Sequence, residues 1–161
     1  MNKYKFVIII GTIVVLTLLT IYAPITLVTG SDEADLASPW VYNNGGTHYA
    51  AVRVGGHSVN HSGIWLYDNV WISFKTKSLS WSVIVVETYA KLEGLKYRGR
   101  YPPKWITIWY ETYNGEKDTT ICRVVQYILK LHGVCIGTFD DIFPWTGPWS
   151  RTAEVYFDAK P

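Results

Sequence analysis

An in-line row of aromatic and polar side chains in residues 105–111 is the feature that most suggests chemistry. The segment alternates like a β-strand, so Trp105, Thr107 and Trp109 are expected on one face and the intervening aliphatic residues on the other. Flat indole rings next to a hydroxyl group suit stacking on sugar rings and bonding to their hydroxyls. We predict a carbohydrate-binding row at these three residues. The alternative is that the tryptophans fill a second layer of the core.

Glu87 is the carboxylate that stands out, because it follows the apolar run 83–86. It lies either at a strand end in solvent or in a groove that would raise its pKa. Glycoside hydrolysis needs two opposed carboxylates, about 5–5.5 Å apart in retaining enzymes, so Glu87 is a candidate catalytic residue. The sequence has no serine–histidine–aspartate spacing, phosphate loop or metal-binding motif, and we expect neither a cofactor nor a metal.

The N-terminal segment indicates export. After a basic start with Lys3 and Lys5, residues 6–30 carry no charged side chain. As a helix they would extend roughly 37 Å, which exceeds the thickness of a bilayer core. Residues 1–30 are therefore predicted to be either a cleaved signal peptide or an uncleaved membrane anchor. In both cases the rest of the chain lies outside the cell, attached to the membrane or secreted.

Two local features predict covalent modifications if the chain is exported. Cys122 and Cys135 are the only cysteines, and outside the cell such a pair is predicted to form a disulfide, with free thiols as the alternative. The sequence Asn60-His61-Ser62 matches the N-glycosylation signal, which makes Asn60 a candidate glycan site.

The charge balance bears on the partners of the exported part. Of the 15 basic side chains, Lys3 and Lys5 belong to the leader, so residues 31–161 carry 13 basic and 13 acidic groups. A neutral domain without a basic run is not typical of proteins that bind nucleic acid. The same balance disfavours electrostatic adhesion to lipid headgroups. Membrane contact is therefore expected through residues 6–30.

The exported part is predicted to be mainly β. Residues 31–39 are small and acidic and are predicted to be a tether, whereas residues 40–161 form one extracytoplasmic domain. Short aromatic and β-branched runs broken by Gly, Asn and Pro are typical of strands. Without intervening helices, they indicate an antiparallel β-sandwich or jelly roll. The predicted strands are residues 49–54, 63–67, 70–75, 81–89, 105–111 and 152–158.

One segment, residues 119–132, has helical rather than strand spacing. Asp118 or Thr119 can cap its start, and Gly133 follows its end. We predict one helix here, packed on the sandwich. The β-branched residues of the segment favour the alternative, another strand pair.

The order of these segments resembles the jelly roll of glycoside hydrolase family twelve, a group of small β-glucanases. Residues 38–45 are similar to the family's N-terminal Asn-Asn-x-Trp-Gly strand, and residues 70–89 to two consecutive strands that end in an acidic residue. Residues 101–109 are similar to its Tyr-Glu-x-Met-Ile-Trp strand. The predicted helix, the motif Pro144-Trp145-Thr146-Gly147 and the final strand resemble the end of the family fold. The resemblance adds Trp40 to the residues expected to bind sugar.

The resemblance also implies that catalysis is lost. The family's nucleophile falls at Trp105 and its acid/base glutamate at Phe143, whereas only the supporting carboxylate has a counterpart, Glu87. We therefore expect an exported cell-surface protein that binds a polysaccharide or glycan without cleaving it. The alternatives are a structural surface or filament subunit, which associates with its own copies by strand addition, and a divergent β-1,4-glucan hydrolase.

Overall fold

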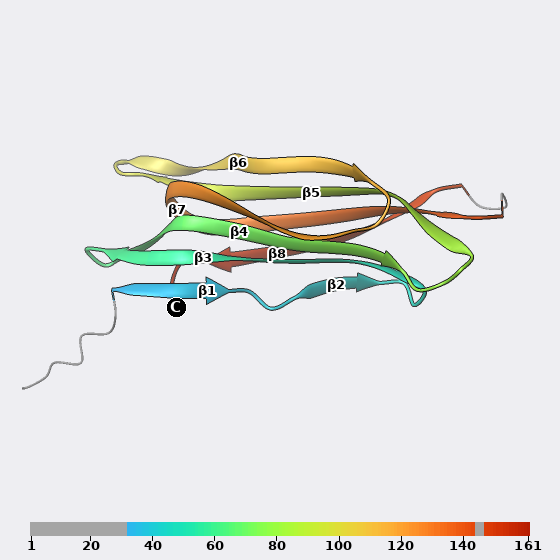
Figure 1. The fold of residues 1–161 in the computed structure, drawn as a ribbon. Coiled ribbons are helices and arrows are strands. Elements are labelled where there is room, and N and C mark those ends of the chain that lie inside the picture. Colours follow the sequence, from blue (N-terminus) through green and yellow to red (C-terminus); the bar gives the residue numbers. More distant parts are fainter. Residues whose placement is uncertain (1–31, 144–146) are drawn as a thin grey trace, which may run out of the picture. The chain divides into compact units, whose positions relative to one another are not determined.

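Antiparallel strands make up most of the described chain (Figure 1). The computed structural model describes residues 32–143 and 147–161, so the helix expected within residues 1–30 and most of the Pro144–Gly147 motif lie outside the described residues. Within the described ranges, no helix is long and apolar enough to cross a bilayer. The strands are β1 (Glu33–Ala37), β2 (Val41–Asn44), β3 (His48–His61), β4 (Ile64–Ser78), β5 (Val83–Arg98), β6 (Tyr101–Asn114), β7 (Lys117–Asp141) and β8 (Trp149–Asp158).

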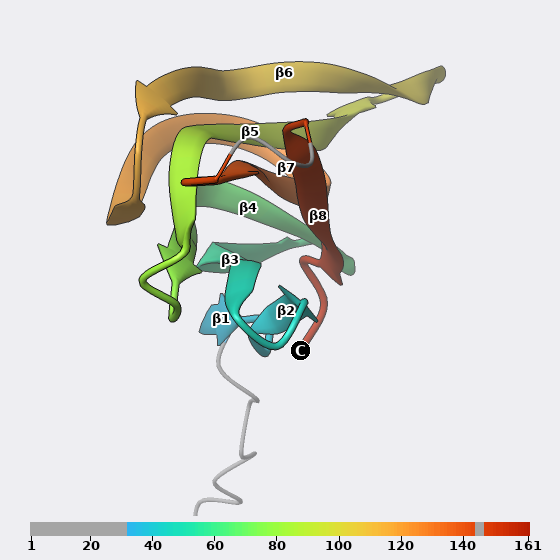
Figure 2. The same cartoon turned by 90° about the vertical axis from the view of Figure 1, so that its right-hand side faces the viewer.

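The strands form one sheet that folds over itself into two layers (Figure 2). The hydrogen-bonded order is β1-β3-β4-β7-β5-β6, with β2 also on β3 and β8 also on β7. The first half of β7 pairs with β4, and its second half pairs with β5 and β8. Strand β7 therefore passes from one layer into the other. The predicted mainly β, antiparallel, sandwich-like architecture is confirmed.

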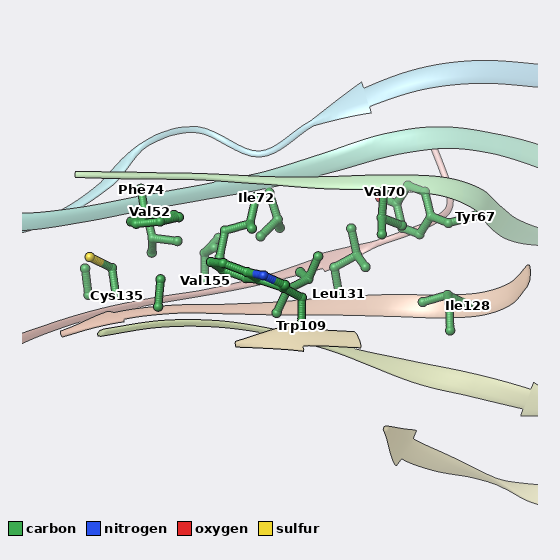
Figure 3. Packing of buried hydrophobic residues seen from close by; sticks show 14 of the residues in the cluster. Val52, Tyr67, Val70, Ile72, Phe74, Trp109, Ile128, Leu131, Cys135 and Val155 are labelled. Atoms are coloured by element: carbon green, nitrogen blue, oxygen red, sulfur yellow. The ribbon is translucent and has the colours of Figure 1, made fainter. Parts of the chain in front are cut away.

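The core lies between the two layers and follows from strand alternation (Figure 3). Alternate residues of β3 and β4, such as Val52 and Val54, belong to this core with apolar residues of β5, β7 and β8, whereas Arg53 and Lys75 at the positions between are half-buried. The buried side chains include Val52, Val54, Val70, Ile72, Phe74, Leu92, Leu131, Cys135 and Val155.

The helix predicted at residues 119–132 is wrong, because this segment is the middle of β7. Its backbone groups pair with β4 up to Ile128 and with β5 beyond it. Tyr127 has a φ of 65°, and the pairing register shifts around it. This irregularity breaks the two-residue alternation, so the core-facing residues recur at intervals of three and four. The inward residues are Ile121, Val125, Ile128 and Leu131.

The predicted disulfide is also wrong, because Cys122 and Cys135 are both free. Both lie on β7, where Cys122 is opposite Trp71 of β4 and Cys135 is opposite Ala90 of β5. One extended strand holds them too far apart for a bond that needs Cα atoms within about 7 Å. Burial raises the pKa of the Cys135 thiol to about 12.

Part of the predicted tether is ordered as a strand. Residues 33–37 form β1, which pairs with Gly55–Val59 of β3. Ser38 continues this contact, since its amide donates to Val54 O at 2.8 Å and its hydroxyl accepts from Val54 N at 3.0 Å. The acidic segment therefore forms an edge of the layer that contains β3 and β4.

Candidate functional site

A β-bulge in β6 splits the predicted carbohydrate-binding row. Ile108 has no partner in β5, whereas Thr107 and Trp109 on either side of it are both paired. An extra residue of this kind disturbs the alternation of the strand. Trp109 therefore turns into the core, where it is 8% exposed and its ring centroid lies 5.7 Å from that of Phe74 (Figure 3). For Trp109, the alternative of a core position holds.

Trp105 remains on the outer face of β6 and is 40% exposed. Its ring centroid lies 6.0 Å from His132 of β7 and 6.1 Å from Tyr156 of β8, with interplanar angles of 74° and 75°. His132 and Tyr156 stack on each other at 4.1 Å with an angle of 2°. Together with Glu93 of β5, these three residues are called the His132 cluster below.

Strand register creates this cluster from four separate strands. Glu93 is opposite Thr107 on one side and His132 on the other, and His132 is in turn opposite Tyr156. Side chains in register on neighbouring strands are close enough to touch. Their neighbours along the chain point into the core, which turns the cluster outward. These neighbours are Leu92, Leu131 and Val155.

Glu93 is the electrostatic centre of the cluster. Its Oε1 accepts a hydrogen bond from Lys91 Nζ at 2.9 Å, and its Oε2 accepts one from His132 Nδ1 at 3.0 Å. Partial burial alone would raise the pKa of Glu93, but the hydrogen bonds from Lys91 and His132 hold it below its usual value. The carboxylate is therefore ionised at neutral pH.

These bonds also orient the imidazole of His132. Because an ionised carboxylate only accepts, the hydrogen on Nδ1 of His132 points toward Glu93. Its Nε2 is buried without a hydrogen-bond partner among the described residues and lies 3.8 Å from Glu154 Oε2. The imidazole thus lies between carboxylates of β5 and β8, and it contacts the rings of Trp105 and Tyr156.

The arrangement is suited to recognition more than to proton transfer. Both oxygens of Glu93 are engaged, and its lowered pKa leaves no proton to donate at neutral pH. Trp105 and Tyr156, 40% and 55% exposed, offer aromatic surface next to charged hydrogen-bonding groups. Thr107 is also exposed and lies opposite Glu93.

Other predicted site residues lie elsewhere. Glu87 is an exposed residue of β5 opposite Asn114 and Thr138, six positions along the strand from Glu93. Trp40 lies between β1 and β2, with the guanidinium of Arg53 4.9 Å and Lys75 Nζ 4.3 Å from its ring centroid. The structure therefore brings neither Glu87 nor Trp40 to the His132 cluster.

Asn60 stands at the end of β3, beside the β3–β4 turn. Its Oδ1 accepts from Gly63 N at 2.7 Å, and its Nδ2 donates to Asp32 Oδ1 at 3.4 Å. The side chain thus stabilises the turn. A glycan at this position stays a prediction.

Sequence reasoning missed Glu93, His132 and Tyr156. The signal for His132 was hidden, because residues 119–132 were interpreted as a helix, whereas strand alternation beyond Leu131 would have turned it outward. No family profile, curated protein or solved structure matches the chain. The function is therefore inferred from the geometry of the site, and the resemblance to glycoside hydrolase family twelve stays a sequence-based expectation.

Proposed function

We propose that the chain is an exported cell-surface protein that binds carbohydrate through the His132 cluster without cleaving it. The observation that carries this proposal is the exposed ring of Trp105, supported by His132 and Tyr156 next to the ionised Glu93. Rings that are already held in place lose little conformational entropy when a ligand stacks on them. Glu93 and Lys91 supply an acceptor and a donor for sugar hydroxyls.

The resemblance to family twelve supports a sugar ligand but not hydrolysis. It places the nucleophile at Trp105 and the acid/base residue at Phe143, neither of which has a carboxylate. Glu87, the remaining counterpart, is remote from the cluster along β5. A role in sugar binding at the His132 cluster requires no catalytic carboxylate.

The test is the migration of residues 31–161 in native gels cast with and without soluble β-glucan. Binding retards the band, and Trp105→Ala and Tyr156→Ala are each expected to reduce the apparent affinity roughly fivefold, since a stacked ring contributes about 1 kcal/mol. Trp81→Ala is the matched control, because Trp81 is 79% exposed but lies in the β4–β5 connection. Staining the gel for polysaccharide reveals hydrolysis as a cleared zone.

Equal retardation of all three variants would contradict the role of the His132 cluster, and a cleared zone would favour the divergent hydrolase. An unchanged mobility with a ladder of oligomers would favour the structural surface subunit. One observation supports this second candidate: among the described strands, β6 pairs only with β5, and the first half of β7 pairs only with β4. These two edges present backbone groups that a strand of another copy can bind.

A further inference from the structure

The end of the β5–β6 hairpin concentrates positive charge. Residues 96–104 contain the exposed side chains of Lys96, Arg98, Arg100 and Lys104 and no acidic residue. Lys96 and Lys104 are directly opposite each other in the hairpin, an arrangement that like-charge repulsion disfavours. In the part of the chain that the structure describes, none of the four forms an ion pair. We call residues 96–104 the basic tip.

Exposed aromatic and aliphatic groups accompany this charge. Tyr101 is 69% exposed, and the guanidinium of Arg98 lies 5.6 Å from its ring centroid. An open hollow of about 470 Å³ adjoins the basic tip. The apolar part of its lining consists of Ile64, Leu66, Tyr97 and Tyr127. Basic groups next to tyrosine and aliphatic side chains are the composition found at membrane–water interfaces.

The start of β1 lies at the same end of the domain as the basic tip. β1 starts at Glu33, which is paired with Val59, and Asn60 N donates to Asp32 O at 2.7 Å. The β3–β4 turn that follows Asn60 lines the hollow together with Arg98. Figure 1 shows the start of β1 and the turns β3–β4 and β5–β6 at one end of the strands. The uncharged residues 6–30 precede this point directly in the chain.

We propose that the basic tip rests on the anionic lipid headgroups of the membrane that holds residues 6–30. Cations within a Debye length of an anionic leaflet are attracted to it, and this attraction offsets the repulsion between Lys96 and Lys104. Composition alone predicted no such adhesion, because residues 31–161 are neutral as a whole. The fold places four of these basic side chains on one exposed hairpin end that contains no acidic residue. This proposal rests on the membrane insertion of residues 6–30 and not on sugar binding.

The test uses the full chain reconstituted into phosphatidylcholine vesicles with or without phosphatidylglycerol. A polarity-sensitive dye is attached at Tyr101→Cys in a Cys122→Ser background, where the buried Cys135 stays unlabelled. We expect a blue shift of the dye emission in the anionic vesicles only. The matched control carries the dye at Trp81→Cys, an exposed aromatic position in the β4–β5 connection at the other end of β4, and shows no shift.

Charge variants test whether the dye shift depends on attraction between the basic tip and the lipid headgroups. The dye shift should be abolished in a chain that carries the three substitutions Arg98→Gln, Arg100→Gln and Lys104→Gln. It should be retained in a control chain that loses the same charge away from the basic tip, through Lys77→Gln, Lys117→Gln and Arg123→Gln. Flotation of the chain with vesicles reports insertion separately. The proposal is overturned by a chain that floats without a dye shift, by an equal shift in neutral vesicles, or by a failure to float with either vesicle. A shift produced by soluble dextran sulfate and not by vesicles would indicate a polyanionic glycan instead.

Discussion

At the residue scale, His48 is a buried polar group whose hydrogen bonds select one tautomer of the neutral ring. It is 5% exposed, and its Nε2 accepts hydrogen bonds from Trp149 Nε1 at 3.0 Å and Arg151 Nε at 3.2 Å. Its Nδ1 therefore carries the hydrogen and donates to Thr47 Oγ1 at 3.1 Å. Burial and the charge of Arg151 lower the pKa of His48, although Asp141 acts in the opposite direction.

The protonation of His48 predicts a loss of stability in mild acid. A histidine whose folded pKa is lowered stabilises the fold fully above its unfolded pKa of about 6.5, and this contribution is lost as the pH falls through the folded pKa. We expect His48→Gln to show a smaller drop in urea midpoint between neutral and acidic pH than the unmodified chain. An identical drop in both proteins would contradict this account of His48.

His57 provides the control of opposite sign. A hydrogen bond with Asp35 at 3.0 Å raises the pKa of His57, so its contribution is present below about pH 6.5 and is lost as the pH rises through the folded pKa. In the same urea series, His57→Asn should therefore make the loss of stability in acid steeper.

At the scale of elements, β7 decides how closely the two layers approach. A Cβ atom added at Gly133 of β7 would lie 2.4 Å from Val54 Cγ1 and 3.2 Å from Val52 Cγ2, both on β3 in the opposite layer. The backbone of β7 thus packs directly against valine side chains. A larger residue fits at this position only if the Val54 side chain or the backbone around it shifts.

This contact predicts a specific interaction between two substitutions. Gly133→Ala should destabilise the fold by about 1–3 kcal/mol, because it overpacks the core. Val54→Ala removes the obstructing methyl group, so the double variant should lose less stability than the sum of the single variants in urea unfolding. Gly147→Ala is the control, since an added Cβ there meets nothing within 4 Å. Strict additivity would show that the layers do not approach as described.

At the scale of the whole molecule, the two layers hold together by packing, without a disulfide among the described residues. Cys135 is fully buried and Cys122 is exposed. We therefore expect a thiol reagent to modify Cys122 in the native protein and Cys135 only after unfolding, as read by mass spectrometry. A reducing agent should leave the melting temperature unchanged. A disulfide closing this loop would contribute about 3 kcal/mol, so a clear fall on reduction would contradict free thiols.

Much of the β architecture could be predicted, because alternation is a local property of the chain. Residues 70–75 alternate as expected and form part of β4, and Trp105 and Thr107 lie on the outer face of β6 as the pattern indicates. At two local irregularities, two-residue alternation gave the wrong prediction. The unpaired Ile108 turned Trp109 into the core, and the bend at Tyr127 gave the middle of β7 the spacing of a helix. Bulges and bends depend on partner strands, which a single sequence does not reveal.

By itself, the sequence determined the strands at residues 70–75, 105–111 and 152–158 and the outward position of Trp105, since both follow from side-chain type and two-residue alternation. Only the tertiary structure decided which residues meet across strands. Register placed Glu93 beside His132 and His132 beside Tyr156, although these residues are distant in the chain. The two cysteines were kept apart because β7 carries both of them along one extended strand. Pairing of distant strands is a property of the folded sheet, and it sets these contacts.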